Sequence, residues 1–179
     1  MRLEPIVNQP TVEAERFTLR PVRRADAGLL SLYTGDARVA WNTGQIPHPL
    51  PPGATEAAIE RAMADDRAED LWVIDGSKDE GEAVLGAISL KRMDRGHSEI
   101  AYWIAPAFWN TGLASEAVRA MIAANPHQAH ALFASVFQDN PASARVLTNA
   151  GFQYIGDAET FSVARNAAVA TWTYVLSTR

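Results

Sequence analysis

Residues 108–117 read FWNTGLASEA, and residues 140–152 read NPASARVLTNAGF. Each stretch has the composition of a loop that turns into the first turn of a helix, with Gly112 before one helix and Asn140-Pro141 at the start of the other. The first turn of a helix presents N–H groups without partners inside the helix, together with the positive end of the helix dipole. The two stretches together predict a protein that binds a phosphorylated ligand at one helix start and guides its arm past the other.

Apolar patterns on either side place these loops in a sheet. Residues 98–104 are apolar on both faces apart from Glu99, which predicts a central strand, and residues 131–137 predict a second buried strand. A helix that begins near Gly112 joins them, so the two strands should be parallel neighbours. Both loops then lie at the carboxyl ends of these strands, the edge at which open α/β sheets bind ligands.

The rest of the chain predicts a mixed α/β fold. We expect a single domain, residues 1–179, with a twisted, mostly antiparallel sheet of about six or seven strands and about four flanking helices. One helix stripe holds Ala25, Leu29, Leu32 and Tyr33, and Thr55 is placed to cap a second helix. The other expected strands cover residues 17–22, 71–74, 83–90 and 171–176. Gly86 inside a strand indicates a bulge or a close backbone approach.

Composition excludes several functions. The net charge of −5 makes duplex nucleic acid an unsuitable ligand, because no basic field attracts phosphates. The absence of cysteine removes disulfides and thiolate chemistry, and the histidines show no ligand spacing, so we predict no metal site. No apolar run approaches the roughly 20 residues that span a bilayer, and no signal peptide is evident. We therefore expect a cytoplasmic protein without a membrane or nucleic-acid partner.

The arrangement resembles the GNAT superfamily of N-acetyltransferases. Their acetyl-CoA signature, Arg/Gln-x-x-Gly-x-Gly/Ala, is matched by residues 109–114, WNTGLA, although Trp109 departs from its first position. This tryptophan and three further segments resemble the ribosomal-protein N-terminal acetyltransferase branch. Those segments are FTLRP at 17–21, SEIAYWI at 98–104, and Asn140-x-x-Ser143-x-x-Val146-Leu147 ending on Gly151-Phe152. Taken alone, Gly112 could merely start a helix and Asn140 could merely cap one.

The resemblance implies a GNAT-like fold, acetyl-CoA as cosubstrate and an amine as acceptor, either a protein N-terminus or a small molecule. It implies that the thioester arm pairs with the strand end at Trp103 and Ile104, and that Asn140 and Ser143 lie near the thioester. Arg145 would lie near the adenosine end. The pyrophosphate would be held by the helix start, namely Trp109, Asn110, Thr111, Gly112, Leu113, Ala114 and Ser115.

The chemistry needs a base, because the acceptor amine arrives as an ammonium. Glu99 is the one ionisable group inside an apolar strand, so burial should raise its pKa, and we predict it as catalytic together with Asn140 and Ser143. The alternative for Glu99 is a structural ion pair with Arg92 or Arg95. His97 shares its side of the strand and is a lesser candidate.

Two positions keep other functions open. Many GNAT enzymes carry a tyrosine on the last helix as a general acid, and Thr148 stands at the corresponding position here. The alternative is therefore a non-catalytic acyl-CoA-binding or regulatory module on the same fold; a weaker one is an anion-binding scaffold. Trp41 precedes a proline-rich loop and either contacts the acceptor or packs inside the protein. The acceptor would be shaped by the loops at 41–53 and 157–168, and a homodimer stays open.

Overall fold

A computed structural model describes residues 8–179. Their main element is one eight-stranded sheet with the order β1-β2-β3-β4-β5-β6-β8-β7. Its strands are β1 Val12–Glu13, β2 Thr18–Pro21, β3 Glu69–Asp75, β4 Gly86–Arg92, β5 His97–Ile104, β6 Ala131–Phe137, β7 Gln153–Ser162 and β8 Ala167–Ser177. All neighbours are antiparallel except β5 and β6, which are parallel as predicted.

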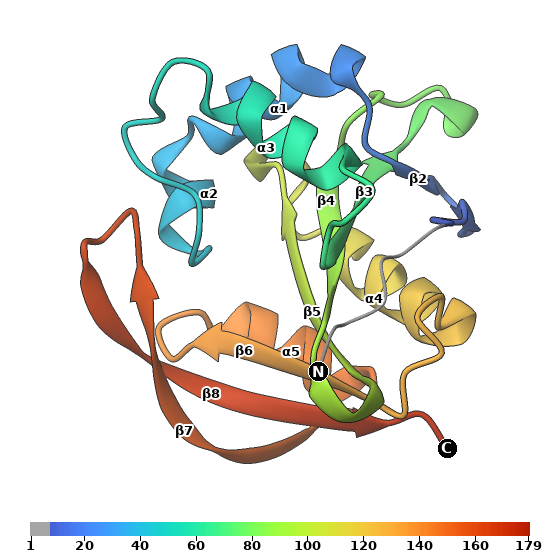
Figure 1. Cartoon of the computed structure of the whole chain (residues 1–179), viewed down its shortest axis with the longest axis vertical. Helices are drawn as coiled ribbons and strands as arrows, with labels where there is room; N and C mark the ends of the chain where they lie inside the picture. Colours follow the sequence, from blue (N-terminus) through green and yellow to red (C-terminus); the bar gives the residue numbers. More distant parts are fainter. Residues whose placement is uncertain (1–7) are drawn as a thin grey trace.

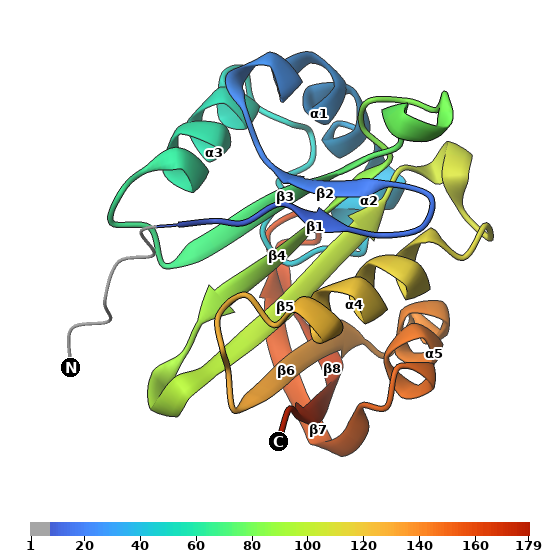
Figure 2. The same ribbon diagram turned by 90° about the vertical axis from the view of Figure 1, so that its right-hand side faces the viewer.

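Helices cover both faces of the sheet (Figure 1, Figure 2). They are α1 Ala27–Thr34, α2 Ala37–Trp41, α3 Ala54–Met63, α4 Leu113–Ala124 and α5 Pro141–Asn149. Figure 2 shows α1 and α3 on one side of the sheet and α4 and α5 on the other. The mixed α/β architecture is therefore the one that the sequence predicts, with slightly more strands and helices than expected.

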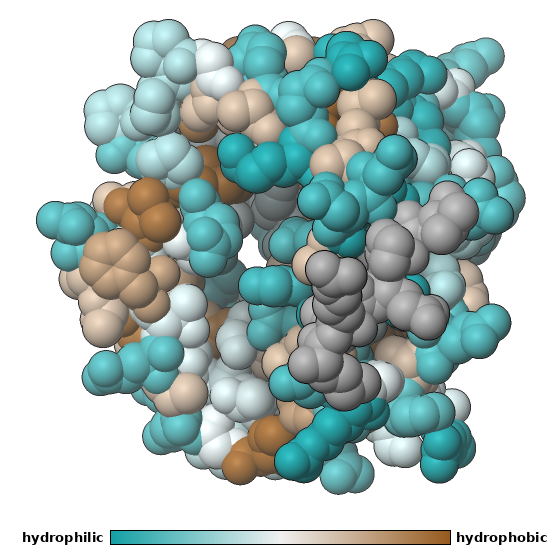
Figure 3. All heavy atoms as spheres, viewed as in Figure 1, coloured by the Kyte–Doolittle hydropathy of each residue, from teal (hydrophilic) through white to brown (hydrophobic). Residues whose placement is uncertain are grey.

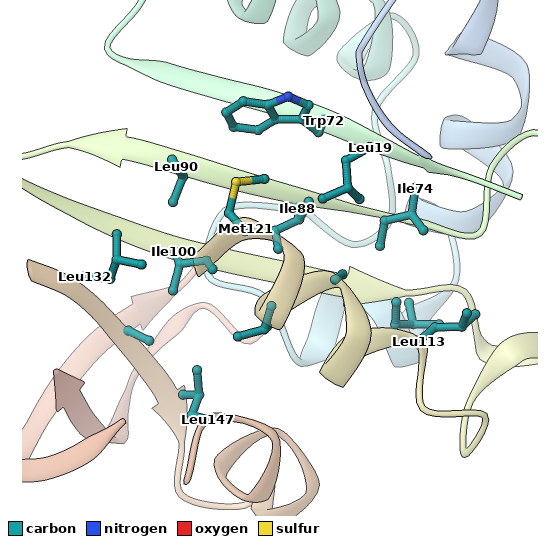
Figure 4. Close-up of a cluster of buried hydrophobic side chains, with 14 of the residues drawn as sticks. Leu19, Trp72, Ile74, Ile88, Leu90, Ile100, Leu113, Met121, Leu132 and Leu147 are labelled. Carbon is teal, nitrogen blue, oxygen red and sulfur yellow. The ribbon is translucent and has the colours of Figure 1, made fainter. Parts of the chain in front are cut away.

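The larger core lies between the sheet and α4, with α5 beside it (Figure 4). Met121 projects from α4 toward Trp72, Leu90 and Ile100, and all four side chains are almost completely buried. At about 25 cal/mol per Å² of apolar surface, burial of each such side chain stabilises the fold by about 1.5–3 kcal/mol. This packing fixes α4 on β5, and with it the position of the loop between them.

The ends of α5 and the glycine in β4 follow the predicted pattern. Asn140 caps α5 by accepting a hydrogen bond from the Ser143 N–H at 3.4 Å. At the other end, Gly151 has φ +102°, and the Phe152 N–H donates to the Leu147 carbonyl at 3.0 Å, a Schellman ending. A Cβ on Gly86 would lie 2.2 Å from the Trp103 oxygen, so β4 and β5 approach closely there.

Other expectations for the N-terminal half are confirmed only in part. Leu29 and Tyr33 pack against the core as predicted, but Leu32 is 66% exposed and Leu30 is the buried leucine of α1. Thr55 is buried within α3 and does not cap it. Gly53 is the N-cap instead, with φ +78°, so the helix begins two residues earlier than expected.

The segment 157–168, expected as an irregular loop, is mostly a hairpin. β7 covers its first part and β8 starts at Ala167. Nearly every residue of β7 is exposed on both faces, so the strand carries no apolar alternation for sequence reasoning to detect. The hairpin turn nevertheless contacts the proline-rich loop, because the Val163 N–H donates to the Gly44 carbonyl at 3.0 Å.

Candidate active site

The parallel strands β5 and β6 pair at their beginnings and then separate. Only His97, Ser98 and Glu99 have partners on β6, and Glu99 opposite Phe133 is the last such pair. β5 continues to pair with β4 as far as Ile104. Figure 1 shows the two strands diverging, and the space-filling view in Figure 3 has an opening at this position. The sheet therefore contains a wedge-shaped gap bordered by two strands.

One border of the gap is an open strand edge, where β5 continues beyond its last partner on β6. The Ala105 N–H donates to Leu85 beside β4, so by alternation Trp103 also faces β4, whereas Tyr102 and Ile104 direct their backbone groups toward the gap. The Ile104 carbonyl accepts a hydrogen bond from the Trp109 indole N–H at 2.8 Å. This bond ties the following loop to the end of β5.

That loop leads into α4 through two residues in left-handed conformations. Asn110 has φ +60° and Gly112 has φ +78°. Gly112 is the N-cap of α4, and no side chain caps the helix. Turns of this kind aim successive N–H groups into one concavity, and the dipole of the twelve-residue helix adds positive potential there. The loop and the first turn thus form a site suited to an anion.

Arg16, which the sequence reasoning missed, braces this loop from outside. Its Nε donates to Glu116 on α4 at 2.7 Å, its backbone N–H donates to the same carboxylate at 3.0 Å, and its Nη1 donates to the Thr111 carbonyl at 2.8 Å. A Cβ on Gly112 would lie 3.5 Å from Arg16 Nη2. In a trans peptide the C=O and N–H point in opposite directions, so the bond to Thr111 turns the Gly112 N–H away from Arg16.

The start of α5 lies across the gap from β5. The Tyr102 hydroxyl contacts Ser143 Oγ at 2.8 Å and donates to the Ser143 carbonyl at 3.1 Å. Burial raises the pKa of Tyr102 to about 12, and the hydrogen bond to Ser143 opposes that shift. Tyr102 thus joins the group that Asn140 and Ser143 form. A tyrosine inside a buried strand needs a polar partner for its hydroxyl, and that was the available sequence signal.

Glu99 lies at the point of the fork, on the face of β5 that also carries Ala101 and Trp103. This is the face of α1 and α3, opposite α4 and α5. Desolvation by burial raises the pKa of Glu99, the charge of Lys91 lowers it, and the charge of Glu69 raises it. Within residues 8–179, Glu99 has no ion pair with Arg92 or Arg95. The His97 ring packs on Phe133, with centroids 5.1 Å apart.

The remaining predicted residues are more peripheral. Arg145 is exposed on α5, and Ser115 is half-buried in the first turn of α4. The Thr148 hydroxyl donates to the Ala144 carbonyl of its own helix at 2.9 Å. That bond occupies its proton within the helix, which agrees with its being a weak acid.

A second polar cluster lies where β5 and β6 begin, away from the open end of the gap. Ser98 Oγ contacts His127 Nδ1 at 2.8 Å, His127 Nε2 contacts Asp70 at 3.0 Å, and Arg67 donates to Asp70 at 2.7 Å. The contacts resemble a Ser–His–Asp triad, but Ser98 and Asp70 are each 1% exposed. Because the cluster is closed to solvent, it serves to connect β3, β5 and the loop before β6.

Two further features of residues 8–179 concern metal binding and membrane insertion. No group of three or more His, Asp or Glu side chains could hold a metal ion in this part of the chain. Likewise, none of the helices described there has the length and apolar character that crossing a membrane requires.

Several solved structures of known proteins are similar to this chain over most of its length. Three similar solved structures cover 91–94% of this chain and 96–99% of their own, at 14–21% identity. A GNAT-family acetyltransferase from Bacillus anthracis has a TM-score of 0.76 and 21% identity. The ribosomal L7/L12 alpha-N-protein acetyltransferase RimL, in complex with coenzyme A, has a TM-score of 0.81 and 14% identity. Spermidine N-acetyltransferase from Vibrio cholerae, in complex with CoA and spermine, has a TM-score of 0.76 and 16% identity.

Similarity at this level of identity establishes the fold. No curated protein matches the sequence. The family comparison is more specific, because the acetyltransferase (GNAT) domain matches residues 16–153, which include β2 to β6, the gap and both helix starts. The chain therefore belongs to the acetyltransferase (GNAT) domain family.

Proposed function

We propose that this acetyltransferase moves the acetyl group of acetyl-CoA to a primary amine by direct attack in a ternary complex. The observation that carries the proposal is the gap between β5 and β6, which has a helix start at the end of each strand. An extended arm with a phosphorylated end fits such a gap, because the strand edge offers backbone partners and the α4 start offers N–H groups to an anion.

Each part of acetyl-CoA has partners in this arrangement. The N–H groups from Asn110 to Ala114, with the Ser115 hydroxyl, hold the pyrophosphate. The end of β5 pairs with the amides of the arm through the Tyr102 backbone groups and the Ile104 N–H, since the Ile104 carbonyl already accepts a hydrogen bond from Trp109. Asn140 and Ser143 lie beside the thioester, and the exposed Arg145 lies toward the adenosine.

Glu99 removes a proton from the ammonium of the acceptor, directly or through water, and leaves a neutral amine. The amine nitrogen then forms a bond to the thioester carbonyl carbon, and the resulting oxyanion meets N–H groups of β5. The C–S bond breaks as the carbonyl re-forms, and the nitrogen loses its second proton to solvent, which gives a neutral amide and the CoA thiolate. Neither step uses a covalent enzyme intermediate.

The thiolate leaves without a dedicated general acid. A thiol has a pKa near 8.5, so proton transfer from Tyr102, whose pKa burial raises to about 12, would be uphill by about three to four pH units. The Thr148 hydroxyl donates a hydrogen bond to the Ala144 carbonyl and is a weaker acid still. Tyr102 instead orients Ser143, and solvent protonates the thiolate after departure.

The acceptor class has two precedents among similar structures. RimL is named for the alpha-amino group of a ribosomal protein, and the Vibrio cholerae enzyme for spermidine. Both acceptors are primary amines, so a primary amine is the acceptor that we infer for this chain.

The test is release of CoA from acetyl-CoA in the presence of a panel of peptides with free N-termini and small amines. We expect turnover with at least one acceptor and loss of that turnover in Glu99→Gln, with acetyl-CoA affinity nearly unchanged. Tight acetyl-CoA binding without transfer to any amine would favour the alternative, a non-catalytic acyl-CoA-binding module, which the internal bond of Thr148 keeps open. Equal affinity for CoA, ATP and free phosphate would favour an anion-binding scaffold.

A further inference from the structure

A pocket of about 310 Å³ lies between α2 and the loop that follows β5. Its walls are two indoles, a methyl group, an amide and a guanidinium, from Trp41, Trp109, Ala37, Asn42 and Arg38. Trp41 is 49% exposed and Trp109 is 40% exposed, so both rings present open surface. Large exposed aromatic surface of this kind typically marks a binding site.

Both walls are connected to the gap. Trp109 donates its indole N–H to Ile104, at the end of β5. The Trp41 carbonyl accepts two hydrogen bonds from Arg165, at 3.1 and 2.9 Å, and Arg165 also pairs with Asp139 at 2.6 Å, next to Asn140. Trp109 is thus fixed to the end of β5, and Trp41 is fixed through Arg165 to the residues that follow β6. The pocket therefore lies beside the open end of the gap.

Charges around the pocket disfavour a polycation. The Arg38 guanidinium lies 5.8 Å from the Trp109 ring centroid, and that of Arg165 lies 4.7 Å from the Trp41 ring centroid. The nearby carboxylates are already paired, Asp36 with Arg38 at 2.8 Å and Asp139 with Arg165 at 2.6 Å. The second ammonium group of a polyamine acceptor would lose its hydration in this pocket. It would also meet two guanidinium groups, because one already lies over each indole ring.

An apolar group on the acceptor would bind favourably in this pocket, where an ammonium group would not. It removes indole surface from water, and a flat ring can stack on the indole faces. We propose that the pocket between Trp41 and Trp109 is the acceptor subsite, and that it selects a primary amine carrying an aromatic or large apolar group over a polyamine. This inference rests on the proposed acetyl transfer, because the acceptor amine must reach the same gap.

The experiment compares three acceptors with the full chain and acetyl-CoA: a peptide beginning with Phe, the same peptide beginning with Ala, and spermidine. We expect kcat/KM for the Phe peptide to exceed both others by about tenfold or more. Trp41→Ala should remove most of that preference by lowering kcat/KM for the Phe peptide more than for the other two acceptors. Leu32→Ala, which truncates an exposed leucine of α1 outside the pocket, is the control and should change none of the three values.

A second variant tests the charge argument without removing a wall. Ala37→Glu adds a carboxylate at the first position of α2, where a helix start tolerates acidic residues. We expect kcat/KM for spermidine to rise several-fold relative to the Phe peptide. A preference of the wild type for spermidine, or an equal loss for all acceptors in Trp41→Ala, would overturn the inference.

Failure of the proposed function has a separate signature. If no acceptor is acetylated, calorimetry of the same three acceptors with the CoA-loaded chain still tests the pocket. Tighter binding of the Phe peptide that depends on Trp41 would support the subsite, whereas equal or absent binding of all three would refute it.

Discussion

Glu99 occupies the last paired position before β5 and β6 separate, so its carboxyl group lies at the point of the fork. A base at this place contributes about 10²–10⁴-fold to the rate in typical enzymes. We therefore expect Glu99→Gln to lower kcat by at least about a hundredfold. Initial rates at saturating acetyl-CoA, together with the CoA dissociation constant, check this expectation. A comparable fall in CoA affinity would indicate a structural role instead.

The raised pKa of Glu99 also predicts the pH dependence of stability. Between the ordinary value of 4.5 and the raised pKa of the folded state, the folded state holds the proton that the unfolded state has lost. Stability from this group is complete below pH 4.5 and is lost as pH rises through the raised pKa of the folded state. Glu99→Gln removes this loss, so the variant should gain stability relative to wild type with rising pH. Denaturant unfolding at pH 4 and pH 7 measures the difference, and an opposite trend would contradict the burial argument.

Tyr102 tests whether a general acid is needed. If the tyrosine only orients Ser143, Tyr102→Phe should lower kcat by less than about tenfold, in line with loss of one neutral hydrogen bond. If it protonates the thiolate, the loss should be larger and should shrink with an acetyl thioester whose thiol has a lower pKa. Rates with two such thioesters distinguish these outcomes.

At the scale of elements, the loop before α4 depends on a contact from the other end of the chain. Arg16 lies 100 residues from Glu116, which it binds, and it fixes the peptide between Thr111 and Gly112. We expect Arg16→Ala to lower kcat/KM for acetyl-CoA by about tenfold, because small misplacement of a binding loop is costly. Acetyl-pantetheine lacks the pyrophosphate, so its kcat/KM in Arg16→Ala should stay within about twofold of the wild-type value.

Matched variants sharpen this test. Arg16→Lys retains the charge without the planar fork and should restore only part of the activity. Arg24→Ala removes an exposed arginine that pairs with Glu60 outside the gap, and it should affect neither substrate. Equal losses for acetyl-CoA and acetyl-pantetheine in Arg16→Ala would show that Arg16 supports the fold as a whole.

The elements that sequence reasoning found are those with local signals. A short stretch of sequence is enough to predict the cap at Asn140, the glycine ending at Gly151 and the apolar strand β6. β7 was missed because most of its residues are exposed, and β1 because it has two residues. At the site, Arg16 has no local signal, since its partners come from a distant helix and loop.

At the scale of the whole molecule, the parallel pair is closed at one end and open at the other. The closed end carries the buried polar cluster of Asp70, His127 and Ser98, with Arg67 completing it. Every hydrogen bond in it joins segments that are distant in sequence except the one between Arg67 and Asp70. The open end is lined by backbone groups and helix starts. The two ends of the parallel pair therefore have different roles, structural at the closed end and ligand-binding at the open one.

This division predicts that the cluster affects stability and leaves catalysis intact. His127→Ala would remove one hydrogen-bond partner from each of the buried Asp70 and Ser98, although Asp70 keeps Arg67, and such a loss typically costs about 1–3 kcal/mol. We expect the free energy of unfolding to fall by about that amount, while kcat/KM for acetyl-CoA stays within about twofold well below the unfolding transition. Denaturant unfolding and steady-state rates on the same sample check both halves. A large loss of activity in a fully folded variant would mean that the fork transmits changes along the strands, because His127 lies beyond direct reach of a ligand in the gap.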